Sequence, residues 1–407
     1  MGSKIEAYYG LPNEVQFCKR CVISNQRPSS TVEFRNEKGE KKSVINFNHD
    51  GICSACVYQE EKETGIDWIG RDQQLVKLLA RFKSNDGSYD VIVPGSGGKD
   101  SAYTAHILKY KYGMNPLTVT WAPHLYTDIG MKNFQEWMHA GGLDNILYTP
   151  NGKLHREMTK NAFHNLLHPF QPFIVGQRII GPAMAKKFGV KLVMYGENQA
   201  EYGNAIEENT NPIMNMDFFS ADDPLSMKFG GVSMQEYINT GRYTKDDFAP
   251  YIAPSKQSLI EAEVEVHYLG YYLKWDPQEC YYYAVDNTGF QANPVRTEGT
   301  YSKYSSIDDK IDPFHYLTTL VKFGIGRCTY DAAQEVRNGK ITRDEAAYLV
   351  KKYDIEFPNK YFKEFLEYID TSDEEFGETV DKHRSPHIWK KDDGVWKLRH
   401  TVAKDGC

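Results

Sequence analysis

Short apolar runs alternate along the middle of the chain with segments in which apolar residues recur at helical spacing. The runs are rich in β-branched and aromatic residues and predict strands at residues 89–93, 116–121, 145–149, 190–195 and 263–269. The segments with helical spacing predict helices at residues 68–82, 102–112, 131–140, 155–167 and 174–188. This alternation predicts an α/β fold with a doubly wound parallel sheet, in which ligands bind at the carboxyl ends of the strands.

The segments outside this alternating stretch have different patterns. Residues 204–254 are rich in Asn, Asp, Gly and Pro, and we interpret them as an insertion over the active site that acts as a lid. Helical spacing returns at Phe314, and Thr342 with Glu345 forms a capping box that opens a further helix. We therefore expect three domains: a cysteine-bearing module at 1–68, the α/β domain at 69–275 and a mainly helical region at 276–407.

Two stretches of the C-terminal region carry notable residues. Residues 322–327 combine a basic pair with two glycines, which fits either a second contact with a polyanion or a glycine-broken turn between helices. Trp389 and Trp396 lie in a tail that is expected to end in a polar, disordered stretch.

Length and composition restrict the class of protein. With 407 residues, of which 41% are hydrophobic and 25% charged, the chain is long enough for two or three globular domains. No apolar run approaches the length of a membrane span, and residues 1–10 lack the pattern of a signal peptide, so we expect a cytoplasmic protein without a membrane partner. The net charge of −7 makes nucleic acid an unlikely partner.

The turn after the first predicted strand reads Gly95-Ser96-Gly97-Gly98-Lys99-Asp100-Ser101. Its three glycines let backbone N–H groups converge on an anion, at the positive end of the helix that follows. The turn does not fit a Walker loop, because Asp100 follows the lysine, and it lacks the glycine spacing of a Rossmann fingerprint. The alternative is a glycine-rich turn without a ligand.

The turn resembles the S-G-G-x-D-S signature of the PP-loop ATP pyrophosphatases, which cleave ATP between its α and β phosphates. This resemblance implies that Ser96, Gly97, Gly98 and Ser101 hold the pyrophosphate. It also implies that Lys99 adds positive charge and that Asp100 helps to hold Mg²⁺.

A second polar group follows the fourth predicted strand, in Gly196-Glu197-Asn198-Gln199-Ala200-Glu201. Because this strand end lies on the same edge of the sheet as the glycine turn, we expect its acids to face the nucleotide and to bind Mg²⁺. Glu201 is the first choice and Glu197 the second, and solvated loop acids are the alternative. Trp121, Gly196 and Asn198, at or just after strand ends, complete the predicted nucleotide-binding set.

Four of the seven cysteines form two C-x-x-C pairs, Cys18 with Cys21 and Cys53 with Cys56, separated by 31 residues. Two such pairs, flanking a segment at 33–51 that we expect to be β-rich, favour a structural zinc site in which four thiolates leave no position for water. A redox pair, inert buried cysteines and an iron–sulfur cluster are the alternatives.

The paired cysteines, SGGKDS, GENQAEYG and the stretch KFGIGRCTYDAAQEVRNGKITRDEA together resemble the N-acetyl sugar amidotransferase family, over residues 16–396. The resemblance implies an ATP-dependent enzyme that converts an acetamido group on a nucleotide-linked sugar, or on a nonulosonic acid, into an acetamidino group during bacterial surface glycan synthesis. The amide oxygen would be adenylylated, ammonia would add, and AMP would leave. Lys99, Asp100, Glu197 and Glu201 are the expected catalytic residues.

Ammonia needs a source, and the remaining cysteines do not provide a glutaminase site. Cys280, Cys328 and Cys407 lie in no sequence setting typical of a glutaminase nucleophile. The family resemblance implies a separate glutaminase partner and a channel-forming companion subunit.

Two other classes of function compete with this hypothesis. A PP-loop sulfur transferase that thiolates tRNA would also carry C-x-x-C pairs, but we would expect a basic surface and catalytic cysteines outside the metal set. A non-catalytic adaptor would not need every polar residue of the glycine turn.

Overall fold

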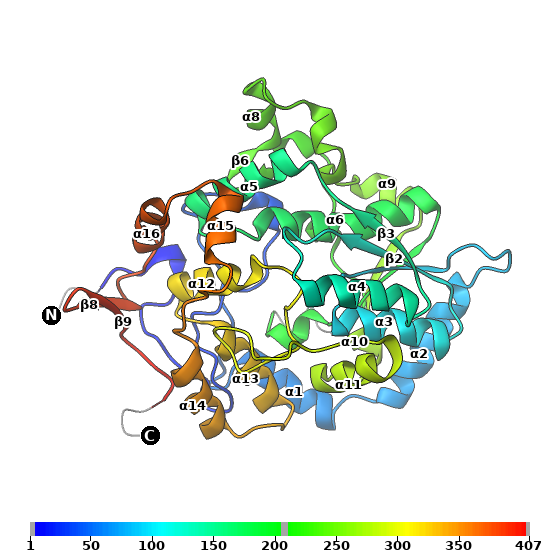
Figure 1. The fold of residues 1–407 in the computed structure, drawn as a ribbon. Helices are drawn as coiled ribbons and strands as arrows, with labels where there is room; N and C mark the ends of the chain where they lie inside the picture. Colours follow the sequence, from blue (N-terminus) through cyan, green and yellow to red (C-terminus); the bar gives the residue numbers. More distant parts are fainter. Residues whose placement is uncertain (1–4, 205–210, 404–407) are drawn as a thin grey trace.

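The centre of the computed structural model, which describes residues 5–204 and 211–403, is a five-stranded sheet with the order β3-β2-β1-β4-β7 (Figure 1). All neighbouring strands are parallel, which confirms the doubly wound sheet predicted from the sequence. The inner strands are apolar runs because both of their faces are covered. The strands are β1 (Val91–Pro94), β2 (Pro116–Trp121), β3 (Asp144–Tyr148), β4 (Leu192–Tyr195) and β7 (Glu265–Tyr268).

Helices cover both faces of the sheet, and the pleat of β1 shows how. Val91 and Val93 belong to the core that includes α3 (Lys99–Tyr110), whereas Ile92 belongs to the core that includes α6 (Gln171–Phe188). Successive side chains of a strand point to opposite faces, so β1 joins two separate hydrophobic cores. The other helices of this part are α2 (Trp68–Phe82), α4 (Asp128–His139) and α5 (Gly152–Leu166).

The strand order places the glycine turn at the point where the sheet reverses its direction of growth. From β1 the chain continues outward to β2 and β3, and it then returns to the other side of β1 with β4 and β7. Such a switch point leaves a crevice at the carboxyl ends of the strands.

The N-terminal module is less regular than predicted. It contains η1 (Tyr8–Gly10), η2 (Glu33–Arg35) and α1 (Ser54–Thr64). The expectation of a β-rich segment at 33–51 is wrong, because the only β pairing described there consists of the isolated bridges Pro28–Val44 and Phe47–Cys53. The segment is mostly polar, and its shape depends on a few buried anchors such as Phe34 and Ile45.

The insertion at 204–254 does not form a lid in its described part, 211–254; residues 205–210 lie outside the description. Phe229, Tyr237, Phe248 and Tyr251 are almost completely buried, in the same core as α6. This part of the insertion lines neither cavity beside the glycine turn, and Figure 1 shows its helix α8 at the far margin of the molecule. The elements between β4 and β7 are η3 (Gln199–Tyr202), η4 (Met216–Phe218), η5 (Pro224–Ser226), β5 (Lys228–Phe229), β6 (Val232–Ser233), α8 (Met234–Asn239), η6 (Lys245–Tyr251) and α9 (Lys256–Glu261).

The C-terminal region is mainly helical, as predicted. The capping box of Thr342 and Glu345 opens α14, and Gly324, with φ of +66°, ends α12. The interpretation of 322–327 as a glycine-broken turn is therefore confirmed, and Lys322 donates to the carbonyl oxygen of Leu166. Its helices are α11 (Pro277–Thr288), α12 (Asp312–Phe323), α13 (Arg327–Arg337), α14 (Arg343–Tyr353), α15 (Phe362–Ile369) and α16 (Asp373–Lys382), whereas α10 (Leu269–Tyr272) directly follows β7.

The tail that carries Trp389 and Trp396 contains a hairpin of β8 (Trp389–Asp392) and β9 (Val395–Leu398). Disorder was expected only in the polar stretch with which this tail ends. Asp393 and Gly394 form its turn, and both have positive φ. Asp-Gly is the typical sequence of such a turn. Residues 404–407, and with them Cys407, lie outside the described part of the chain.

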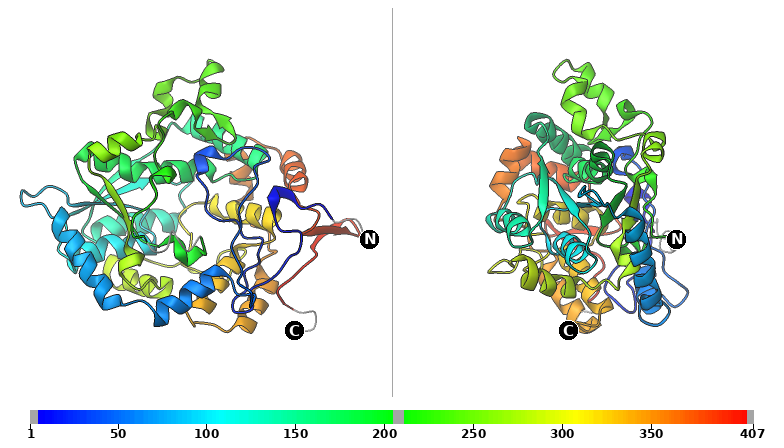
Figure 2. Two further views of the ribbon diagram at one scale, coloured as in Figure 1. Left: turned by 180° about the vertical axis from the view of Figure 1, so that it is seen from behind. Right: turned by 90° about the vertical axis from the view of Figure 1, so that its right-hand side faces the viewer.

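The three predicted domains share hydrophobic cores. Cys18 and Cys53 are in one core with Ala332 of α13 and Trp389 of β8. Figure 2 shows the N-terminal segment, in dark blue, running beside the C-terminal region. Arg343 of α14 also donates to the carbonyl oxygens of Cys18 and Cys21. None of the helices in 5–204 and 211–403 is both long and apolar enough to cross a membrane.

We predict that Gly176→Ala destabilises the fold. A Cβ at Gly176 would lie 2.2 Å from the ring of Trp121, so α6 would have to move away from the sheet. Overpacking of this kind costs about 1–3 kcal/mol, which urea denaturation measures. Gly152→Ala is the control, because its added Cβ meets nothing within 4 Å. Equal urea midpoints for the two variants would contradict the prediction.

Candidate functional site

The glycine loop, residues 95–98, joins β1 to α3 and has no room for side chains at two of its glycines. A Cβ at Gly95 would lie 2.1 Å from the Cβ of Ser101, and one at Gly97 would lie 2.8 Å from the Cα of Phe134. Gly97 also has φ of +82°. Gly98 caps α3 without a side-chain acceptor, so the first N–H groups of this helix face the loop without an intrahelical partner. This cradle fits a phosphate group.

Lys99 and Asp100 place opposite charges at the cradle. The Nζ of Lys99 lies 2.6 Å from Oδ2 of Asp100. Burial opposes the charge of Lys99, but Asp100 and Glu197 raise the pKa of its ammonium above the ordinary value. Oδ1 of Asp100 is buried without a hydrogen-bond partner in the described structure. A carboxylate oxygen in this position fits a hard cation such as Mg²⁺.

The two predicted acids after β4 point in different directions. Glu197 faces the glycine loop, accepts a hydrogen bond from the hydroxyl of Tyr202 and lies 3.3 Å from Nε2 of Gln334. Burial, with the charge of Asp100 nearby, raises the pKa of Glu197 to about 7. In this environment Glu197 can change its protonation state near neutral pH or bind a cation.

Glu201, the first choice from the sequence, is placed away from the loop. Its two carboxylate oxygens lie 2.9 and 3.0 Å from Nζ of Lys62, and both side chains are almost completely buried. Lys62 also donates to the carbonyl oxygen of Trp275. The geometry assigns Glu201 to a buried ion pair that joins α1 to the α/β domain.

Of the three other residues predicted to contact the nucleotide, only Gly196 lies at the glycine loop. Gly196 lies beside the loop, and a Cβ there would meet Trp275 at 2.7 Å. Asn198 is fully buried and caps η3 through the N–H of Ala200. Trp121 is buried in the sheet core, stacked on Tyr148. Asn198 and Trp121 line neither of the cavities beside the loop.

Two cavities meet at the glycine loop, and both are large enough for a small-molecule ligand. The first cavity, of about 350 Å³, extends from the loop between the N-terminal module and α13. The second cavity, of about 400 Å³, extends between α6 and the ends of β4 and β7. Both are lined by Ser96, Gly98, Asp100, Glu197, Tyr202, Ser306 and Asp308.

Asp308 was not singled out from the sequence, although it lines both cavities. Its carbonyl oxygen accepts from the N–H of Thr127, and its Cα is so close to Gly130 that a Cβ there would lie 2.4 Å away. Burial raises the pKa of the Asp308 carboxyl group above its ordinary value, although a hydrogen bond with Ser96 partly offsets this increase. The polar run Ser305-Ser306-Ile307-Asp308-Asp309 before α12 was the available signal.

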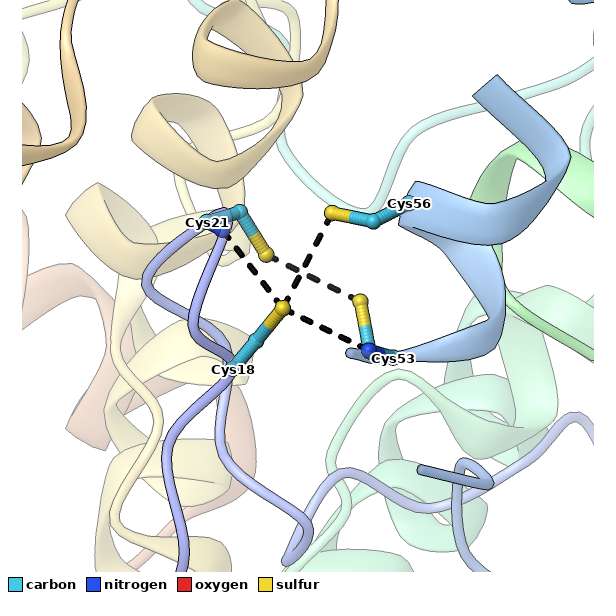
Figure 3. Close-up of side chains that lie close together, drawn as sticks. All are labelled: Cys18, Cys21, Cys53 and Cys56. Carbon is cyan, nitrogen blue, oxygen red and sulfur yellow. Dashed lines mark hydrogen bonds between the residues drawn. The ribbon is translucent and has the colours of Figure 1, made fainter. Parts of the chain in front are cut away.

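The four paired cysteines form a buried cluster at the start of α1 (Figure 3). The Sγ atoms of Cys18 and Cys56 are 3.9 Å apart, those of Cys21 and Cys53 are 3.8 Å apart, and all four lie within 4.8 Å of one another. A tetrahedral ion with metal–sulfur bonds of about 2.3 Å places its sulfurs about 3.8 Å apart. The cluster therefore fits a single metal ion, whereas an iron–sulfur cluster needs sulfurs that are further apart.

The four-cysteine cluster supports one wall of the first cavity through neighbouring residues. Ala55, between the last two cysteines, and Ile23 and Ile45 line that cavity. The N–H groups of Arg20, Cys21 and Cys53 point to Sγ of Cys18 at 3.4–3.5 Å. Four buried sulfurs leave no ligand position for a substrate, so the cluster supports the wall without reacting.

Comparison with known families identifies the region that closes the first cavity. Residues 298–403 match the family model for the C-terminal domain of WbpG-like LPS (lipopolysaccharide) biosynthesis proteins. This similarity to WbpG-like proteins extends over residues 298–403, which is less than half of the chain. The resemblance stated from the sequence is confirmed there.

Two further kinds of comparison give weaker likenesses. The uncharacterised protein MJ1599 of Methanocaldococcus jannaschii is 31% identical over 78 residues, which are 19% of this chain and 27% of that protein. NMN synthetase from Francisella tularensis is 14% identical, covering 73% of this chain and 95% of its own, with a TM-score of 0.30. The U34-tRNA thiolase NcsA from Methanococcus maripaludis, solved with its 4Fe–4S cluster, is 13% identical, covering 75% and 86%, also with a TM-score of 0.30. At these TM-scores the two structures carry no argument about this chain.

The WbpG-like region contributes directly to the site. Tyr304, Asp331, Gln334 and Arg337 line the first cavity opposite the glycine loop. Asp331 accepts a hydrogen bond from the Thr300 hydroxyl, and burial raises the pKa of its carboxyl group. The loop and the WbpG-like region therefore form one site.

We predict that Lys62→Met destabilises the protein by about 3–5 kcal/mol, because it leaves the buried carboxylate of Glu201 without its partner. Adding Glu201→Gln should recover part of this loss in urea denaturation. Lys274→Met is the control, because Lys274 and Glu63 form an exposed pair at 2.5 Å and its loss should cost about 1 kcal/mol or less.

The same variants separate the ion-pair role of Glu201 from the metal role expected from the sequence. If Glu201 bound Mg²⁺, Glu201→Gln alone would weaken binding of Mg–ATP and leave the stability of the fold unchanged. That result would contradict the structural assignment.

Proposed function

We propose that this protein is an ATP-dependent amidotransferase that converts an acetamido group on a nucleotide-linked sugar, or on a nonulosonic acid, into an acetamidino group. AMP and pyrophosphate would be the other products, and the reaction would serve bacterial surface polysaccharide synthesis. The observation that carries the proposal is that a glycine loop with the geometry of a phosphate cradle and a region similar to WbpG-like proteins line one cavity.

The residues of the loop would act on ATP by positioning and by neutralising charge. The amide carbonyl oxygen would attack the α phosphorus, which forms an O-adenylyl imidate and releases pyrophosphate. The N–H groups at the start of α3 and the ammonium of Lys99 would stabilise the charge of the departing pyrophosphate. Asp100 and Glu197 are the residues placed to hold Mg²⁺, which supplies further positive charge at the phosphates.

Ammonia would then add to the imidate carbon, and AMP would leave with the former carbonyl oxygen. We propose that a separate glutaminase supplies the ammonia through a channel-forming companion subunit. Burial raises the pKa of both Cys280 and Cys328, and neither thiol lines a cavity at the loop in the described structure. A reactive thiolate has a lowered pKa and is partly exposed, whereas these two thiols are buried and have raised pKa values.

The same cysteine environments argue against the competing tRNA thiolase, which would need an accessible thiolate near the nucleotide. We expect the amidotransferase to act in the cytoplasm, where ATP is available and thiolates are kept reduced. The metal at the four cysteines would be zinc, because the sulfur spacing suits a single tetrahedral ion.

The test of the function measures AMP and pyrophosphate release with ATP, Mg²⁺ and ammonium, in the presence of acetamido nucleotide-sugars, free nonulosonic acids or bulk tRNA. We expect AMP only with an acetamido sugar, and mass spectrometry should show that one oxygen of that sugar is replaced by NH. Lys99→Met should reduce AMP release about a hundredfold. The control Lys111→Met removes a half-exposed lysine from just beyond the end of the same helix and should leave the rate unchanged. If tRNA were the only acceptor that triggered AMP release, and only with a sulfur donor present, the protein would instead be a tRNA thiolase.

We predict one zinc ion per chain and no stoichiometric iron, measured by elemental analysis of the purified protein. Cys56→Ala should lose the metal, because it removes one of four ligands. Cys328→Ala, which removes an equally buried thiol outside the cluster, should keep it. Iron together with visible absorption would instead show an iron–sulfur cluster.

A further inference from the structure

Two arginines face the first cavity without an acidic partner. Arg27 comes from the N-terminal module, and Arg337 comes from the last turn of α13. Neither forms an ion pair with an Asp or Glu side chain within residues 5–204 and 211–403. Cations near a buried cavity are usually paired, so two arginines without an acidic partner indicate a site that suits an anion.

The structure around Arg27 holds its guanidinium beside the Tyr330 hydroxyl but leaves its Nη1 atom without a partner. Its backbone is fixed on both sides, by the N–H of Ile45 at 2.9 Å and by the carbonyl of Ser24 at 3.3 Å. The guanidinium lies over the rings of Tyr202 and Tyr330, at 5.6 and 5.7 Å from their centroids. Its Nη1 atom is buried and has no hydrogen-bond partner among the described residues.

Arg337 is held in a similar way by a backbone group. Its Nη2 lies 3.2 Å from the carbonyl oxygen of Glu201, whose carboxylate is already occupied by Lys62. The guanidinium of Arg337 is therefore oriented without being neutralised by this contact.

The metal cluster offers a competing explanation, in which the arginines only balance its thiolate charge. Burial opposes the charge of Arg337, while the thiolates of Cys21, Cys56 and Cys53 raise the pKa of its guanidinium, and Glu201 adds a smaller contribution in the same direction. Burial is the largest influence on Arg27 and lowers its pKa. Tyr330 raises it, the charge of Arg337 lowers it, and the thiolates of Cys53 and Cys21 raise it. The hydrogen bonds to Sγ of Cys18, however, come from backbone N–H groups. Both arginines line the cavity, and Nη1 of Arg27 keeps no partner in the described structure.

We propose that Arg27 and Arg337 bind an anionic group of the acceptor substrate: the diphosphate of a nucleotide-linked sugar or the carboxylate of a sugar acid. The proposal rests on the function proposed above, since ATP would occupy the glycine loop and the acceptor the rest of the first cavity. Guanidinium groups recognise both kinds of oxyanion through paired N–H donors.

Tyr202 connects this anion subsite to the reacting groups. Its hydroxyl donates to Glu197 beside the loop, and its ring packs on Arg27. An acceptor held by Arg27 therefore has its neighbouring atoms near Glu197, Lys99 and Asp100. The N-terminal module would contribute a specificity-determining residue, six positions after Cys21, in addition to the metal site.

The experiment measures binding by calorimetry with the glycine loop filled by Mg²⁺ and α,β-methylene-ATP. UDP-N-acetylglucosamine carries a diphosphate, and N-acetylneuraminic acid carries only a carboxylate, so the two probes distinguish the two sources of the anion. We expect wild-type protein to bind one of them and Arg27→Gln to bind it about tenfold more weakly or worse. Arg27→Lys, which keeps the charge, should recover part of the affinity.

Arg20→Gln is the matched control, because Arg20 lies in the same module but pairs with Glu60 on the surface. It should bind the probe as the wild type does. Zinc content and the affinity for the ATP analogue should stay unchanged in every variant, which separates the subsite from the metal cluster and from the glycine loop.

Three results would overturn the subsite. They are binding of neither probe by the wild type, unchanged probe affinity in Arg27→Gln, and loss of zinc or of the ATP analogue in that variant. The AMP-release assay with wild-type protein reports on the proposed function separately. If the wild type forms the acetamidino sugar but Arg27→Gln leaves the probe affinity unchanged, the proposed function stands and the proposed subsite is wrong.

Discussion

The site depends on the close approach of the glycine loop to its surroundings. Gly95 packs on Ser101 and Gly97 packs on the backbone of α4, at distances that leave no space for a Cβ. This contact fixes the direction in which α3 leaves the sheet, so the first N–H groups of the helix, Lys99 and Asp100 all face the crevice at the switch point. The cavities, the acids and the arginines have a functional meaning only because this backbone is held in one place.

Segments far apart in the sequence converge on this point, and the shared cores explain how. Arg27, Lys99 and Arg337 belong to three predicted domains, yet all three line the first cavity. The core around the metal cluster contains residues of α12, α13 and β8, and the buried pair of Lys62 and Glu201 joins α1 to the strand end after β4. A site built between units keeps its geometry only if those units cannot move apart, and these buried contacts provide that constraint.

The sequence predicted the elements with strong periodicity well. Residues 68–82 were predicted as a helix and form α2 with the same bounds, and all five predicted strands are present in the parallel sheet. The glycine loop and the four cysteines were also found, because tight turns and thiolate sites use few residue types at short spacing.

The errors arose where tertiary contacts decide the structure. Between Glu197 and Glu201 the sequence could not tell which acid faces the loop, because η3 turns the second one toward Lys62, 139 positions away. The insertion was interpreted as a lid because it is rich in Asn, Asp, Gly and Pro, although a few large aromatic residues anchor 211–254 in the core. Arg27 has no local signal, since its role depends on Tyr330 and Arg337 at the other end of the chain.

The metal cluster illustrates how a structural site influences chemistry that it does not perform. A single ion bound by the four cysteines would add to the hydrophobic core that the irregular N-terminal module shares with α13 and β8. Once Cys18, Cys21, Cys53 and Cys56 are held together, Ala55 and the segment that carries Arg27 are fixed against α13. The wall of the first cavity is therefore rigid, although its N-terminal side has little regular secondary structure. A short peptide segment can place a charged side chain accurately only when its backbone is constrained on both sides, and here the metal site and the pairing with residue 45 supply the two constraints.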